Sequence, residues 1–138
     1  MSGTLSHVAY IDDDIDILCI AKIALGTVGN LETALIHGPQ LALEQLVRAS
    51  PDLILLDVMM PEVDGPTLLS EILHHPLLAK TPVIFMTAKV QPKEVSHYLA
   101  LGAIGVIPKP FDPMTLAQEV RQLWDKWNDR ESIASFVA

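Results

Sequence analysis

Short apolar runs alternate with longer amphipathic segments along the chain, and this alternation restricts the possible folds more than any other feature. Each apolar run has the length and composition of a β-strand, and each amphipathic segment has the apolar spacing of a helix. Regular alternation of this kind is typical of a parallel sheet covered by helices on both faces. We therefore predict one doubly wound α/β domain, (βα)5. Strands are expected near residues 6–11, 31–36, 53–57, 82–87 and 104–107, and helices near 14–28, 39–49, 65–75, 92–101 and 112–127.

The strands differ in how much of their surface they are expected to bury. The runs near 53–57 and 82–87 are apolar without alternation, as expected for central strands between two helical layers. The run near 31–36 contains Glu32 and Thr33, which favours a position at an edge of the sheet.

Two helix starts are marked by a carboxylate followed closely by proline, at Asp64 and at Asp112. Beyond the last predicted helix, the final residues carry no capping signals, so they either extend that helix or hang free. We therefore expect a domain over residues 1–127 and a C-terminal tail over residues 128–138.

The composition indicates a soluble, acidic protein. Half of the 138 residues are hydrophobic, but apolar runs stop far short of the roughly 20 residues that a membrane span needs. The start Met1-Ser2-Gly3-Thr4 has no signal-peptide character, so we expect a cytoplasmic protein without a membrane partner. The net charge of -8 and the lack of a Lys/Arg cluster argue against a nucleic-acid partner. The single cysteine, Cys19, has apolar neighbours, which predicts a buried structural thiol.

Polar side chains stand where four of the predicted strands end. Asp12 and Asp13 follow the first strand, Asp57 ends the third, Thr87 ends the fourth, and Lys109 follows the fifth. The carboxyl ends of parallel strands lie at one edge of a sheet, where such folds bind their ligands. We therefore expect these five side chains to form a single site.

Three carboxylates at close quarters suit Mg²⁺, which prefers oxygen ligands and keeps several of its waters. We expect Asp13 and Asp57 to bind the ion directly and Asp12 to hold a metal-bound water. The backbone carbonyl of Met59, in the turn after Asp57, is expected to complete the protein's share of the ligands. The cation would also relieve the mutual repulsion of the carboxylates.

A carboxylate beside Mg²⁺ can act as a nucleophile toward a phosphoryl group if the transferring oxygens are stabilised. Lys109 is placed to pair with one phosphoryl oxygen, and the Thr87 hydroxyl is placed to donate to another. Small Ala88, next to Thr87, leaves room for a phosphodonor. The residues thus predict an aspartyl phosphate at Asp57.

Four motifs stand in order along the chain, each at a strand end. They are Ile11-Asp12-Asp13-Asp14, Leu56-Asp57-Val58-Met59-Met60-Pro61 with Asp64-Gly65, Met86-Thr87-Ala88, and Lys109-Pro110-Phe111. Together they resemble the receiver domain of two-component response regulators over about residues 6–125. The resemblance implies a flavodoxin-like sheet with strand order 2-1-3-4-5 and a chemotaxis-regulator-like signalling module rather than an enzyme. Because 138 residues fit one domain, we expect a stand-alone receiver.

By this resemblance, Asp57 is the phosphoacceptor, Asp12 and Asp13 form the acidic pair, and Thr87 and Lys109 are the switch hydroxyl and the phosphate-binding lysine. The resemblance further implies a cis peptide bond between Lys109 and its proline. Expected partners are a histidine kinase or histidine phosphotransfer protein and a downstream protein target. The phosphorylated form is expected to act through a changed surface around the fourth and fifth helices.

Other interpretations stay open. Taken singly, the acidic pair resembles a helix cap, Thr87 a backbone-bonding hydroxyl and Lys109 a solvated lysine; their joint occurrence favours a site. Val106 occupies a position where many receivers have an aromatic residue, which supports an interaction module that works without phosphorylation. A phosphatase is disfavoured because Met59 stands where a second acid is expected. A flavodoxin is disfavoured because the acids at 12–14 would repel a bound phosphate.

Overall fold

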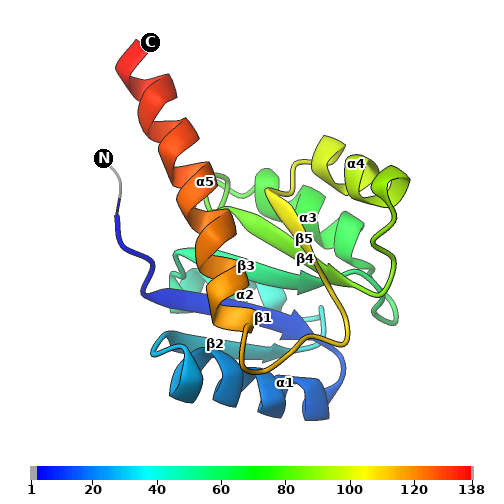
Figure 1. The fold of residues 1–138 in the computed structure, drawn as a ribbon. Helices are drawn as coiled ribbons and strands as arrows, with labels where there is room; N and C mark the ends of the chain where they lie inside the picture. The colour runs from blue at the N-terminus through cyan, green and yellow to red at the C-terminus, as the bar shows by residue number, and fades with distance from the viewer. Residues whose placement is uncertain (1–2, 138) are drawn as a thin grey trace.

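The computed structural model describes residues 3–137, which fold into a five-stranded parallel sheet with order β2-β1-β3-β4-β5 (Figure 1). This order and the two helical layers confirm the predicted flavodoxin-like α/β class. The strands are β1 (His7–Asp12), β2 (Glu32–His37), β3 (Leu53–Asp57), β4 (Val83–Thr87) and β5 (Gly105–Pro108). The helices are α1 (Ile15–Lys22), the π-helix η1 (Ile23–Val28), α2 (Ala42–Ala49), α3 (Gly65–Leu73), α4 (Pro92–Ala100) and α5 (Leu116–Val137).

The sheet separates two hydrophobic cores. On one face, Leu53 and Leu55 pack with residues of α1, η1 and α5. On the other face, Ile54 and Leu56 pack with residues of α2, α3 and α4. Every residue of β3 is buried, because successive side chains of this central strand enter opposite cores. The predicted edge position of β2 is confirmed, since it pairs with β1 alone.

The last helix differs from the prediction at both of its ends. It begins at Leu116 instead of near 112, because the Asp112 side chain accepts from the Met114 amide (2.8 Å) and holds residues 113–115 in a turn. It continues to Val137, so the described part of 128–138 extends the helix instead of hanging free. In Figure 1 its last turns rise beyond the rest of the domain.

The burial predicted for Cys19 is wrong, because its side chain is exposed. The buried residues of α1 are Leu18 and Ala21, and consecutive helical residues do not share a face. Apolar sequence neighbours were therefore a poor guide to burial within this helix.

Across residues 3–137, none of the helices combines the length and the apolar character that a membrane crossing requires.

The start of α3 lies against the end of β3 with no room for a side chain. The predicted cap is confirmed, since Asp64 Oδ1 accepts from the Thr67 amide at 2.8 Å. The next residue, Gly65, donates its amide to the Val58 carbonyl at 2.8 Å. A Cβ at Gly65 would lie 2.5 Å from the Asp57 carbonyl oxygen. Glycine here lets the helix approach the strand end that carries Asp57.

We expect Gly65→Ala to lower the free energy of unfolding by about 1–3 kcal/mol, because backbone atoms must move to admit the methyl group. Urea unfolding measures this loss. The matched control is Gly26→Ala in η1, where a Cβ would meet only the Leu31 carbonyl at 3.7 Å. Equal stability of the two variants would show that α3 can shift away from β3 without cost.

Candidate functional site

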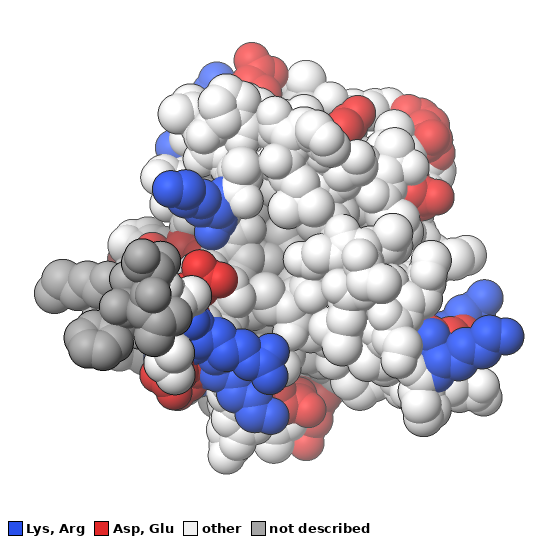
Figure 2. Space-filling view, turned by 90° about the horizontal axis from the view of Figure 1, so that it is seen from above, with Lys and Arg blue, Asp and Glu red and all other residues white. Residues whose placement is uncertain are grey.

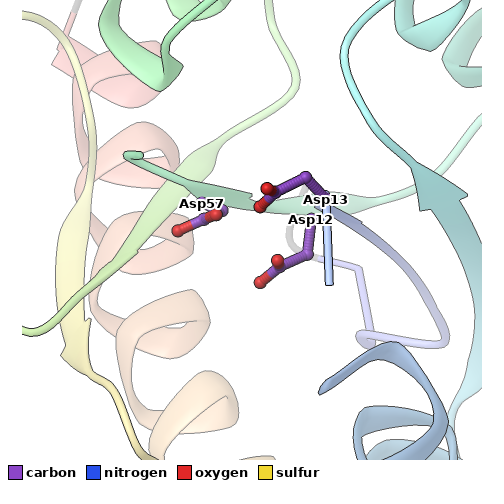
Figure 3. A group of neighbouring side chains, drawn as sticks. All are labelled: Asp12, Asp13 and Asp57. Atoms are coloured by element: carbon purple, nitrogen blue, oxygen red, sulfur yellow. The ribbon is translucent and has the colours of Figure 1, made fainter. Parts of the chain in front are cut away.

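The predicted acidic cluster forms at the carboxyl ends of β1 and β3. Figure 3 shows the carboxylates of Asp12, Asp13 and Asp57 directed into the same space. One oxygen from each residue lies within 4.8 Å of the others. Asp12 and Asp57 are buried, whereas Asp13 is exposed. The cluster therefore has a solvent-facing side at Asp13 and a dry side at the other two carboxylates.

Lys109 joins the two buried carboxylates. Its Nζ donates to Asp57 Oδ1 at 3.0 Å and to Asp12 Oδ2 at 3.1 Å. Burial disfavours its charge, but the Asp57 hydrogen bond and the charges of both carboxylates hold the pKa of Lys109 above its ordinary value. The lysine is therefore a permanent cation between two anions.

Burial also raises the pKa of Asp57 to about 6, with the charge of Asp12 adding to the rise and the Lys109 hydrogen bond opposing it. Ionised Asp57 is consequently costly in the absence of a further cation. A divalent ion in the cluster would offset that cost, which fits the donor set of hard carboxylate oxygens.

Thr87 is the last residue of β4 and contributes a buried hydroxyl at this edge of the sheet. Its backbone carbonyl accepts from the Lys109 amide at 2.9 Å, which ties the ends of β4 and β5 together. Its buried hydroxyl oxygen accepts from the Lys89 amide at 3.1 Å and keeps its own proton to donate. The peptide bond between Lys109 and Pro110 is cis, as the family resemblance implied.

The three consecutive acids at the end of β1 make different contacts. Asp14 caps α1, since its Oδ1 accepts from the Asp16 amide at 2.9 Å. Asp12 Oδ1 accepts from the Asp14 amide at 2.9 Å, which leaves Oδ2 for Lys109. The side chain of Asp13 takes part in neither arrangement among the described hydrogen bonds. Asp14 therefore caps a helix, while Asp12 and Asp13 belong to the acidic cluster.

Sequence reasoning overlooked two residues beside the cluster. His37 is not among the predicted site residues, yet its Nε2 lies 3.0 Å from the Asp13 carbonyl oxygen. The register pairs His37 with Asp12, a relation that no local motif reveals. Tyr10 is fully buried two residues before Asp12, on the same face of β1. Strand periodicity was the one sequence signal that could have drawn attention to Tyr10.

Comparison with known proteins agrees with this geometry. A family model for the response regulator receiver domain matches residues 8–121. The chain belongs to this family. Receiver domains are signalling modules of two-component systems, and they typically bind Mg²⁺ at an acidic pocket such as the one formed here.

Individual relatives support the assignment. The receiver is 31% identical over 119 residues to Response regulator SaeR of Staphylococcus aureus, covering 86% of this chain and 50% of SaeR. The chain thus spans about half the length of the curated relatives it matches. Chemotaxis response regulator CheY4 of Vibrio cholerae is 27% identical with a TM-score of 0.79, over 87% of this chain and 99% of that chain. A receiver protein N-terminal domain from Methanoculleus marisnigri is 28% identical with a TM-score of 0.70, over 86% and 96% of the two chains.

We expect millimolar Mg²⁺ to raise the melting temperature at pH 8, where Asp57 is ionised, because an ion that binds only the folded state stabilises it. Asp13→Asn should reduce this rise more than Asp12→Asn, since Asp13 is the predicted direct ligand. The measurement is the shift of each variant relative to its own ion-free melting temperature. Exposed Asp125 on α5 supplies the control, and Asp125→Asn should respond as the wild type does. A larger loss in Asp12→Asn would contradict the ligand assignment.

Proposed function

We propose that this receiver accepts a phosphoryl group on Asp57 from the phosphohistidine of a histidine kinase or phosphotransfer protein, in the presence of Mg²⁺. The observation that carries the proposal is the position of the Asp57 carboxylate, buried among Asp12, Asp13 and the Lys109 ammonium. Asp12 shares the cluster and pairs with Lys109 at 3.1 Å, but its other oxygen accepts from the Asp14 amide, which makes Asp57 the better nucleophile.

In the proposed transfer, an Asp57 oxygen forms a bond to phosphorus while the phosphorus–nitrogen bond of the donor breaks and the imidazole leaves. Lys109 turns from the carboxylates toward one phosphoryl oxygen, and the Thr87 hydroxyl donates to a second. Bound Mg²⁺ would supply positive charge near the remaining phosphoryl oxygen. The residues that would hold the ion are Asp13, Asp57 and the Met59 carbonyl, and Asp12 would hold a metal-bound water. Exposed Ala88 leaves the approach to Asp57 free of a large side chain.

The proposed output is a change in protein contacts on the side formed by α4, β5 and α5. Figure 2 looks down on the α4 and α5 side and shows a broad central area free of charged side chains. Leu99 and Leu101 on and after α4 are 45% and 37% exposed. An uncharged area with exposed leucines, flanked by charges, is typical of a protein-binding surface. The downstream partner is accordingly proposed to be a protein, with no nucleic-acid contact by this domain.

A second candidate function is a receiver-fold interaction module that works without phosphorylation. One observation favours it: Val106 on β5 is half-buried against the α3–α4 core and has no ring whose rotation could relay a signal. The intact Asp57, Thr87 and Lys109 favour the phosphorylated module instead.

Intact-mass analysis after incubation with acetyl phosphate separates the two candidates. The phosphorylated module predicts a mass increase of one phosphoryl group in Mg²⁺ and none in EDTA. An unchanged mass in Mg²⁺ would leave the phosphorylation-independent module as the better explanation.

A further inference from the structure

The Tyr10 hydroxyl is buried without a partner. Tyr10 has 0% exposure at the middle of β1. Among the described residues, its hydroxyl oxygen is the one buried side-chain polar atom that makes no hydrogen bond. A buried hydroxyl that makes no hydrogen bond is costly, so a function in another state of the site is a physical reason to keep it.

The surroundings of this hydroxyl favour a carboxylate as its acceptor. Burial, then the charges of Asp12 and Asp57, and then the nearness of the Asp12 carboxylate as an acceptor hold the pKa of the Tyr10 phenol above its ordinary value. The phenol therefore stays a neutral O–H donor. The Phe111 ring lies 6.4 Å from the Tyr10 ring, and Tyr10 belongs to the core between the sheet and α5. Tyr10 thus lies in this core, two residues before Asp12 on the same face of β1.

Asp12 needs a replacement donor when the site is loaded. In the structure, Asp12 Oδ1 accepts from the Asp14 amide and Oδ2 accepts from Lys109. Transfer of Lys109 to a phosphoryl oxygen would leave Oδ2 without that donor, in a side chain with 0% exposure. A buried carboxylate that loses a cationic partner is disfavoured unless other donors replace it. The proposed metal-bound water can supply one donor, and each carboxylate oxygen accepts two hydrogen bonds, so a position for a second donor stays open.

We propose that Tyr10 is a positioning residue, whose hydroxyl donates to the Asp12 carboxylate once Lys109 turns to a phosphoryl group on Asp57. The donor exchange keeps Asp12 oriented within the acidic cluster while the lysine is engaged elsewhere. It rests on the proposed function, because only occupation of Asp57 draws the lysine away.

The test compares Tyr10→Phe with Tyr98→Phe, which removes the same atom from the second tyrosine. Tyr98 is also buried, and its ring packs 5.1 Å from Phe85 in the opposite core. The probe is beryllium trifluoride with Mg²⁺, a tetrahedral mimic of a phosphoryl group, and calorimetry measures its affinity. We expect Tyr10→Phe to bind about tenfold more weakly, the range for losing a hydrogen bond to a charged group. Tyr98→Phe should bind as the wild type does.

A spectroscopic readout separates positioning from packing. The chain has two tyrosines, so in Tyr98→Phe the Raman tyrosine doublet reports Tyr10 alone. Addition of beryllium trifluoride should change that doublet from a phenol without a hydrogen bond to a strong donor. A doublet that does not change, or equal affinities of the two variants, would overturn the donor exchange and leave phosphorylation of Asp57 intact. Failure of the wild type to bind the probe would overturn the proposed function itself, and the donor exchange with it.

Discussion

Asp57→Asn is expected to abolish uptake of a phosphoryl group from acetyl phosphate in Mg²⁺. The amide nitrogen and oxygen of asparagine keep nearly the shape of the carboxylate but lack its charge and nucleophilicity. Neither of the neighbouring acids can substitute. Asp12 gives both of its oxygens to the Asp14 amide and Lys109, and Asp13 has no lysine partner among the described contacts. Intact mass measures the loss directly, because the labelled and unlabelled chains are counted in one spectrum.

Two comparisons make this result specific. Asp125→Asn changes the charge by the same amount at an exposed site on α5 and should leave labelling unchanged. The folded state of Asp57→Asn should persist, since burial already disfavours the ionised carboxylate and raises the pKa of Asp57 to about 6. Full labelling of a folded Asp57→Asn variant would place the phosphoacceptor elsewhere. Efficient labelling of the wild type in EDTA would remove the role of the metal.

Thr87→Ala is expected to erase the change in amide hydrogen exchange that phosphorylation produces around residues 87–101. The hydroxyl is the side-chain group that can follow the phosphoryl oxygens from the end of β4. Its backbone already links the Lys109 amide (2.9 Å) to the loop that leads into α4, and its oxygen holds the Lys89 amide (3.1 Å). A shift of this one side chain therefore moves the loop before α4.

Val106→Ala provides the matched comparison and should largely preserve the exchange response. A β-branched side chain has few χ1 alternatives, so Val106 is expected to keep its rotamer when Asp57 is phosphorylated. A phosphoryl group can shift the loop before α4 only if it interacts more strongly with one conformation of that loop than with another. We expect that interaction to be its hydrogen bond to Thr87. A larger loss of coupling in Val106→Ala than in Thr87→Ala would contradict this relay. The absence of any change in the phosphorylated wild type would favour the phosphorylation-independent module.

Much of the site was accessible from local sequence because its residues stand at strand ends. Unbroken apolar runs predict buried parallel strands, and their carboxyl ends necessarily share one edge of the sheet. Asp57 and Thr87 lie at the ends of β3 and β4 as expected, and Asp12 ends β1. These side chains and Lys109 therefore meet because each stands at a strand end and all the strands are parallel. The cap at Asp64 was equally local, because it depends on an amide three residues away.

The features that escaped prediction depend on segments distant in sequence, except for the start of α5, which a local turn sets. Cys19 is exposed because the sheet determines which side of α1 is covered, and α5 starts late because Asp112 bonds a nearby amide in a turn. The double pairing of Lys109 spans 97 and 52 residues, and the lack of a partner for Tyr10 depends on atoms from several elements. The sequence by itself determined the strands, their ends and the types of side chain at the site. Only the tertiary structure decided which of those groups are buried and which donor meets which acceptor, because burial and hydrogen-bond partners are properties of the assembled layers.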